Sequence, residues 1–298
     1  MRKKKMIIIK LEGGLGNQMF QYALANIVAK KNETTILIDN TFFSQTQKKE
    51  GFTPRNFELS IFNNTYINAS SSDIATFYKP SILEKFKSKL GFNSFKVYYE
   101  KQFGFDNNLQ SINSPVYLSG YFQSYKYFIG HESFIRKLFA FPFEKLDAVN
   151  RKMLLKINNS NSISVHIRRG DYVSDKITQN YHGNCSLSYY EEAISNIASK
   201  IDDITFFFFS DDLEWVKKQF KDLSYPKFFI DHNQNNDNWK DMFLMSSCNH
   251  NIIANSSFSW WAAWLNANID KKVIAPKKWF SDAEKNANDL IPVEWIRL

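Results

Sequence analysis

Short apolar segments alternate with helical patterns over most of this 298-residue chain, and this alternation constrains its fold more than any other feature. Residues 6–11 form a β-branched apolar run, residues 20–28 carry apolar side chains at helical spacing, and residues 35–39 again resemble a strand. A strand, a helix and a strand in that order form a βαβ unit, whose two strands lie parallel. The chain is therefore expected to begin with an α/β domain.

The same alternation resumes in the second half of the chain. Strand-like runs are expected at residues 115–120, 163–167, 204–209, 227–230, 251–254 and 272–275, and helices at residues 188–201, 213–220 and 257–266. The Asn/Ser-rich residues 158–162 read as a linker. We therefore expect two Rossmann-like domains, residues 1–157 and 158–298, facing a cleft. Residues 41–110 show little periodicity and are rich in lysine, which is typical of solvated loops.

Composition excludes several classes of protein. The apolar fraction of 44% supports large cores, and no apolar run approaches the roughly 20 residues of a membrane span. Lys10 and Glu12 interrupt the apolar run that follows the basic N-terminus, so a secretory signal is not expected. Cys185 and Cys248 are the only cysteines, which argues against a disulfide framework and favours the cytoplasm. A net charge of +8 favours anionic partners.

Ligands of doubly wound folds bind at the carboxyl ends of strands, and the first polar segment at such a place is rich in glycine. Gly13, Gly14, Gly16, Asn17 and Gln18 lie between the first strand and the first helix. Glycine allows the backbone to approach a ligand, and a helix N-terminus attracts anions. The third glycine of a dinucleotide-binding motif is missing, so a simple tight turn explains the segment equally well.

A basic segment follows the strand at residues 163–167. His166, Arg168, Arg169 and Asp171 are contained in the sequence His-Ile-Arg-Arg-Gly-Asp-Tyr. Two adjacent guanidinium groups suit a shared anion, because their planar forks bind phosphate oxygens in pairs. A surface ion pair of one arginine with Asp171 is the alternative.

Two further segments are polar where a strand ends. Ser210, Asp211 and Asp212 follow the strand at residues 204–209, and their carboxylates could cap the next helix, hold a metal or accept hydrogen bonds from guanine. Asn255, Ser256 and Ser257 precede the helix at residues 257–266, where they could cap that helix or bind a phosphate.

Other kinds of site find little support. The five histidines lie at positions 131, 166, 182, 232 and 250, none of them at the spacing of a helical metal site. No Gly-x-Ser-x-Gly hydrolase motif occurs. The basic balance lacks any recognisable nucleic-acid-binding pattern, so nucleic acid is not an expected partner.

Taken together, four blocks resemble glycosyltransferase family 11, the α-1,2-fucosyltransferases. They are Gly-Gly-Leu-Gly-Asn-Gln-Met-Phe-Gln-Tyr (13–22), Gly-Tyr-Phe-Gln-Ser (120–124), His-Ile-Arg-Arg-Gly-Asp-Tyr (166–172) and Ile-Ala-Asn-Ser-Ser-Phe-Ser-Trp-Trp (253–261). The resemblance implies a GT-B fold and an inverting transfer of L-fucose from GDP-β-L-fucose to a hydroxyl of a surface glycan. Galactose O2 is the expected acceptor position, and no metal or other cofactor is expected.

The resemblance also suggests roles for the residues in these blocks. Arg168 would stabilise the departing GDP, because charge builds on that group during transfer. Asp171, Asp175 and His166 are candidates for the base that accepts the acceptor proton. Donor-binding roles fall to Arg169, Gly13, Gly14, Gly16, Asn17, Gln18, Ser210, Asp211, Asp212, Asn255, Ser256 and Ser257. Asp211 is expected to bind guanine.

The expected partners are GDP-fucose and a galactose-containing oligosaccharide or lipid-linked glycan. The basic N-terminus and the lysines of residues 79–101 could also hold the protein at the anionic inner face of a membrane, although solubilising charge explains them as well. A glycosyltransferase that uses another nucleotide sugar and a non-catalytic glycan-binding protein are the alternatives.

Overall fold

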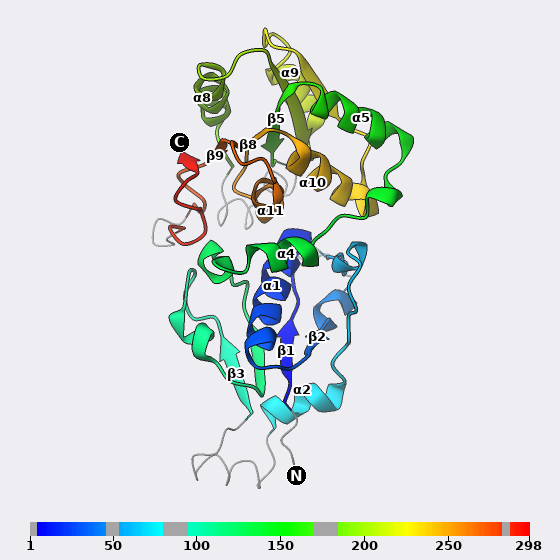
Figure 1. Ribbon diagram of the computed structural model, residues 1–298, viewed down its shortest axis with the longest axis vertical. Helices are drawn as coiled ribbons and strands as arrows, with labels where there is room; N and C mark the ends of the chain where they lie inside the picture. Colours follow the sequence, from blue (N-terminus) through cyan, green and yellow to red (C-terminus); the bar gives the residue numbers. More distant parts are fainter. Residues whose placement is uncertain (1–4, 46–53, 80–94, 170–183, 282–286) are drawn as a thin grey trace. The chain divides into compact units, whose positions relative to one another are not determined.

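The computed structural model describes residues 5–45, 54–79, 95–169, 184–281 and 287–298 (Figure 1). The chain divides into two compact units. The first comprises Met1–Lys48, Thr53–Ala140 and Asn288–Leu290, and the second comprises Lys49–Phe52, Phe141–Ala287 and Ile291–Leu298. The main division thus falls between residues 140 and 141, whereas the sequence placed it after residue 157.

The first unit is built around a four-stranded parallel sheet with the strand order β2-β1-β4-β3. Its strands are β1 (Ile7–Lys10), β2 (Ile36–Asp39), β3 (Lys96–Tyr99) and β4 (Val116–Ser119), and its helices are α1 (Leu15–Lys31), α2 (Ser71–Tyr78) and α4 (Glu132–Leu138). Short 3₁₀ helices span Thr41–Ser44, Leu59–Ile61, Asn107–Ser111 and Tyr125–Phe128. The predicted βαβ opening is confirmed.

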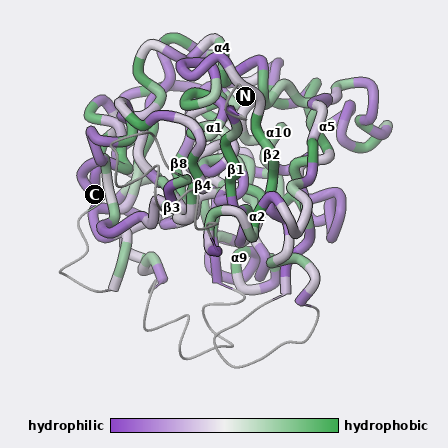
Figure 2. Tube along the Cα trace, turned by 90° about the horizontal axis from the view of Figure 1, so that it is seen from below, coloured by the Kyte–Doolittle hydropathy of each residue, from purple (hydrophilic) through white to green (hydrophobic). Residues whose placement is uncertain are grey.

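Burial of β1 on both faces explains its continuous apolar sequence. Ile7, Ile8 and Ile9 have no exposed surface, and Figure 2 draws this strand in the colour of apolar residues. Ile8 packs with Phe77 of α2 and Tyr117 of β4 in one core cluster. The carboxyl end of β1 is thereby fixed at the centre of its sheet.

The second unit is built around a six-stranded parallel sheet with the order β10-β9-β8-β5-β6-β7. Its strands are β5 (Asn161–Ile167), β6 (Ile204–Ser210), β7 (Lys227–Ile230), β8 (His250–Ile252), β9 (Val273–Ala275) and β10 (Ile296–Arg297). Its helices are α5 (Ala148–Asn158), α8 (Leu187–Ala198), α9 (Leu213–Gln219), α10 (Asn238–Ser247) and α11 (Ser257–Leu265), and 3₁₀ helices span Phe143–Lys145 and Asn235–Asp237.

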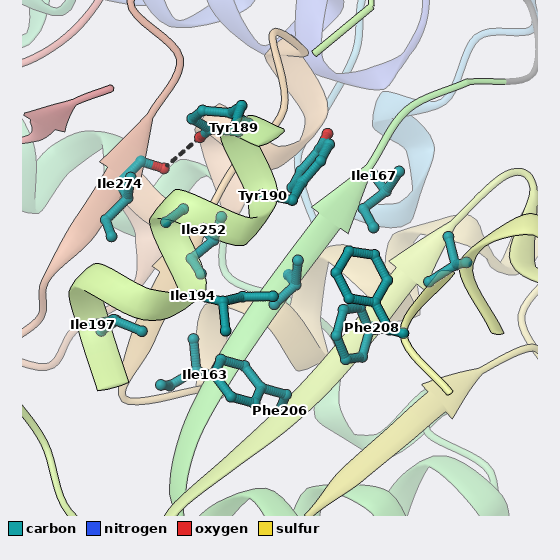
Figure 3. Close-up of a cluster of buried hydrophobic side chains, with 14 of the residues drawn as sticks. Ile163, Ile167, Tyr189, Tyr190, Ile194, Ile197, Phe206, Phe208, Ile252 and Ile274 are labelled. Atoms are coloured by element: carbon teal, nitrogen blue, oxygen red, sulfur yellow. Dashed lines mark hydrogen bonds between the residues drawn. The ribbon is translucent and has the colours of Figure 1, made fainter. Parts of the chain in front are cut away.

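Alternate residues of β5 face different helices. Ile163, Val165 and Ile167 pack with α8 and with phenylalanines of β6 in a core cluster (Figure 3). His166 belongs to the other face, and its ring contacts Phe258 of α11 at 5.9 Å between centroids. His166 is therefore buried near the carboxyl end of β5, two residues before Arg168.

The structure corrects two predictions. Residues 158–162 are not a linker, because α5 ends at Asn158 and β5 begins at Asn161. Polar side chains are tolerated there because they form hydrogen bonds: Asn249 Oδ1 accepts from both the backbone N–H and the hydroxyl of Ser162. The described parts of residues 41–110 are also more than loops, since they contain α2 and the edge strand β3.

Candidate functional site

The second sheet has a topological switch point between β5 and β8. From β5 the chain proceeds to β6 on one side, and it later returns to β8 on the other side. In open α/β sheets the helices on the two sides of such a point leave a crevice outside the carboxyl ends of the strands. Arg168 follows β5 directly, and Asn255 and Ser256 lie between β8 and α11. The topology thus assigns these three predicted residues to one edge of the sheet.

Asp211 fixes Arg168 at this edge. Its Oδ2 lies 2.9 Å from Nη1 of Arg168, and each of the two side chains is one-quarter exposed. Its Oδ1 accepts a hydrogen bond of 2.8 Å from the backbone N–H of Arg169. Both carboxylate oxygens therefore already have a partner on the segment after β5. This arrangement favours positioning of the arginine over the expected recognition of guanine.

Arg169 has a different partner from its neighbour. Its Nε donates to Asp212 Oδ2 at 3.2 Å, and its guanidinium lies 3.9 Å from the ring centroid of Trp215. Asp212 Oδ1 in turn accepts the N–H of Trp215 at 3.3 Å, and Ser210 Oγ accepts the N–H of Asp212 at 3.0 Å. Asp212 therefore caps α9, as one of the sequence alternatives proposed. The two arginines are each held by a carboxylate of their own.

His166 is a buried polar residue without a full set of partners. Its side chain is 6% exposed, and within the described residues its Nδ1 has no hydrogen-bond partner. Burial lowers its pKa to about 4, assisted by Arg168 and opposed by Asp211. The imidazole is thus neutral at physiological pH. A base is most effective when its pKa is near the working pH, so His166 is poorly suited to that role.

Two more buried polar atoms at this edge of the second unit lack a partner in the described part of the chain. They are Oδ1 of Asn184 and the hydroxyl of Tyr190, which Figure 3 shows pointing away from the aliphatic core. Asn184 precedes Cys185, whose thiol contacts Oδ1 of Asn255 at 3.4 Å. Native proteins leave few buried polar atoms unsatisfied, so these atoms have hydrogen-bonding capacity that the described residues do not fully use.

The start of α11 is shaped by its own hydrogen bonds. Ser256 Oγ accepts the N–H of Phe258 at 3.3 Å and so caps the helix. Asn255 is almost fully buried, and its Nδ2 donates to the carbonyl of Trp279 at 3.2 Å. Ser257 is partly exposed in the first turn. The helix is nine residues long, and its positive end faces the edge that carries Arg168.

The glycine-rich segment lies in the first unit, at the carboxyl end of β1. Gly13 has a φ of +79°, and a Cβ there would lie 2.5 Å from Nδ2 of Asn17. Gly14 is the N-cap of α1, whose first turn includes Gly16 and Asn17. Nε2 of Gln123 donates to Oδ1 of Asn17 at 2.7 Å. Glycine at position 13 is therefore required by the turn itself.

Gln18 has a structural role in this segment. It has no exposed surface, and its Nε2 donates to the carbonyls of Gly13 and Asn56 at 2.9 and 2.8 Å. Its Oε1 accepts the backbone N–H of Glu58 at 2.9 Å. Both amide hydrogens are thus in use, and the side chain holds the turn instead of facing a ligand.

Glu58 lies beside the glycine-rich segment, although no sequence motif marks it. Its carboxylate accepts a hydrogen bond from the backbone N–H of Leu15, at the start of α1. Burial raises its pKa above the ordinary value, against the lowering effects of that N–H and of Arg55. The N-terminus of α1 therefore already has an acidic partner. This makes the start of α1 less suited to a phosphate than the start of α11.

Asp171 and Asp175 lie outside the described residues, so their positions remain a prediction. In the described ranges, no group of three or more His, Cys, Asp and Glu side chains could hold a metal ion. No helix within those ranges is long and apolar enough to cross a bilayer.

The sequence contained partial signals for some of the other residues now found near the site. Trp215 lies three positions after a capping aspartate, and Gln123 belongs to the block at residues 120–124. Asn184 and Tyr190 carry no motif, because their significance depends on burial.

Two known proteins are similar to this chain over nearly its whole length. An α-1,2-colitosyltransferase of Escherichia coli is 35% identical over 294 residues, which cover 98% of this chain and 99% of that protein. The O-antigen biosynthesis glycosyltransferase WbnK of Escherichia coli is 34% identical, with 97% and 99% covered. A galactoside α-(1,2)-fucosyltransferase 1 of Leontocebus fuscicollis is 31% identical over 104 residues, 35% of this chain and 28% of that protein.

Similarity to solved structures is weaker. POFUT1 in complex with GDP superposes with a TM-score of 0.49 at 14% identity, covering 88% of this chain and 94% of that one. No inference about function follows from a likeness of this degree. The sequence itself is decisive, because residues 1–298 match the model of the family described as Glycosyl transferase family 11; the chain belongs to that family.

Proposed function

We propose that this protein transfers a 6-deoxyhexose, in the first place L-fucose, from its GDP-linked form to a hydroxyl of a glycan. The acceptor position is galactose O2, and the product is an α-1,2-linked sugar formed with inversion. Family membership and the two full-length relatives support a glycosyltransferase. In this proposal the two units are the halves of a GT-B enzyme, with the donor bound by the second.

The observation that carries the proposal is the fixed position of Arg168 beside the β5–β8 switch point. As the glycosidic bond to GDP breaks, negative charge grows on the β-phosphate. A cation held in place beforehand stabilises this charge without having to reorganise during the reaction. Asp211 supplies that fixation, and the start of α11 adds backbone N–H groups on the neighbouring strand end.

Colitose is a second candidate for the transferred sugar, favoured by the relative that is 35% identical. It is fucose without the 3-hydroxyl group. A site that hydrogen-bonds this hydroxyl discriminates strongly against the deoxy sugar, whereas an apolar pocket tolerates both. Comparing kcat/KM for GDP-fucose and GDP-colitose therefore identifies the donor.

Asp171 and Asp175 are the proposed bases, because the low pKa of His166 makes its imidazole a weak proton acceptor. The pH–rate profiles of Asp171→Asn and Asp175→Asn test this choice. If neither variant changes the profile, a water relay replaces the base. The proposal also requires no metal ion, so excess EDTA should leave the initial rate unchanged.

The proposed function is tested by mass analysis of the products from a panel of GDP-sugars and galactosides. Release of GDP together with a product enlarged by one deoxyhexose is the expected result. Retention of glycan without turnover would favour a glycan-binding protein, and consumption of a different nucleotide sugar would favour another transferase. Arg168→Ala should lower the rate by about 10²–10³-fold.

A further inference from the structure

Helix α5 and the 3₁₀ turn before it carry a surface that the proposed chemistry does not use. We call it the α5 face. It combines apolar and cationic side chains: Phe143, Lys145, Val149, Arg151, Lys152, Leu155 and Lys156. Figure 1 draws α5 beside α10, and Lys240 of α10 pairs with Asp147, the N-cap of α5.

The apolar members of the α5 face are unusually exposed. Phe143 is 50% exposed, Val149 55% and Leu155 62%, so three of the large exposed apolar side chains in the described chain fall within thirteen positions. The opposite side of α5 is buried through Asn150 and Ile157. These three side chains lie on the exposed side of α5 and of the turn before it, interspersed with cations.

The polar members of the α5 face are predominantly basic. The segment from residue 143 to residue 156 has four cations and two carboxylates, Glu144 and Asp147. Asp147 pairs with Lys240 at 2.9 Å, and the same ammonium pairs with Asp237 at 3.0 Å. Arg151 lies over the ring of Phe143, 5.0 Å from its centroid, and Lys156 lies over the ring of Phe228 at 4.0 Å. Lys152 is exposed and forms no ion pair with any described residue.

We propose that the α5 face docks on an anionic lipid surface. A helix with apolar and cationic side chains on its outer side lies in the headgroup region, where the apolar groups enter the acyl boundary and the cations attract anionic lipids. Charge complementarity selects this occupant, because a second copy of the chain would bring the same cations face to face. The proposal does not depend on which sugar is transferred.

The test is sedimentation of the full-length protein with vesicles of phosphatidylcholine, with and without phosphatidylglycerol, at low and high salt. The parent should bind only the anionic vesicles, and binding should weaken with salt. Each cation contributes about five-fold to partitioning. Lys152→Glu combined with Leu155→Ser should therefore reduce binding by about 20-fold or more, with GDP release in solution unchanged.

The matched control is Lys200→Glu combined with Ile269→Ser, since Lys200 is exposed and Ile269 is 94% exposed elsewhere on the same unit. This control should bind like the parent. Equal losses in both double variants, or equal binding to neutral and anionic vesicles, would overturn the proposal. So would a dimer in light scattering that Leu155→Ser dissociates, because the α5 face would then bind a second copy.

Discussion

Asp211→Asn tests whether a carboxylate orients Arg168. The substitution keeps the size of the side chain but leaves one acceptor oxygen in place of two, so the amide can accept from Arg168 or from the backbone N–H of Arg169 but not from both. A hydrogen bond to a charged group contributes about 1.5–3 kcal/mol, against about 1 kcal/mol for a neutral one. The difference is about 0.5–2 kcal/mol, and since both side chains are one-quarter exposed, solvent screening reduces it to about 0.5–1 kcal/mol.

Expressed as a rate, this loss is about 2- to 5-fold in kcat/KM. It should appear chiefly in kcat, because the arginine acts on charge that develops during bond breaking. The assay is the initial rate of GDP release with the donor that the parent consumes. Asp212→Asn is the matched comparison: it removes the pair with Arg169 but retains a side chain that caps helices well, so its rate loss should be smaller.

A double-mutant cycle gives the sharpest outcome. If Asp211 acts through Arg168, adding Asp211→Asn to Arg168→Ala should lower kcat/KM little further than Arg168→Ala alone. Fully additive losses would refute the positioning role and would return Asp211 to direct contact with the donor. Parental kcat/KM in Asp211→Asn would refute it as well.

Three further predictions concern stability. Burial raises the pKa of Asp241 to about 7, so the free energy of unfolding falls as pH rises from about 4 to 7. Asp241→Asn should therefore raise the free energy of unfolding at pH 8 by about 2–4 kcal/mol, with a higher Tm, and should have little effect at pH 4. Gly13→Ala should cost about 1–2 kcal/mol in urea unfolding, because a positive φ and Asn17 both oppose a Cβ, and an unchanged midpoint would contradict this. Phe208→Ala should cost about 3–5 kcal/mol, since its buried ring packs against three other phenylalanines; a loss below 1 kcal/mol would contradict that packing.

The parallel sheets were predictable because their strands are buried on both faces and read as continuous apolar runs, as in β6. Edge elements were not. β3 is half exposed and contains a lysine and two tyrosines, so its sequence resembles that of a solvated loop. The boundary at residue 158 was misplaced for a related reason. Asn161 and Ser162 favour turns in isolation, and only their partners Asp202 and Asn249 allow them to begin a strand.

The sequence predicted which strand ends carry the candidate site, but not which contacts each of its residues makes. Sequence spacing shows that Arg168 and Arg169 follow a strand, yet it cannot show that each binds a different aspartate. Likewise, Gln18 resembled a ligand contact until its three hydrogen bonds were known. Such roles depend on which atoms are already satisfied, and that is a property of the folded chain.

The pairing of β5 with β8 determines when the proposed donor site can first form during synthesis. The strands touch each other across 87 positions of sequence, as the bond between Ser162 and Asn249 illustrates. During synthesis, the arginine segment leaves the ribosome long before the serine-capped helix that completes the crevice. A nascent or prematurely terminated chain thus has one side of the proposed donor site without the other, and we expect GDP to protect only a nearly finished polypeptide from proteases.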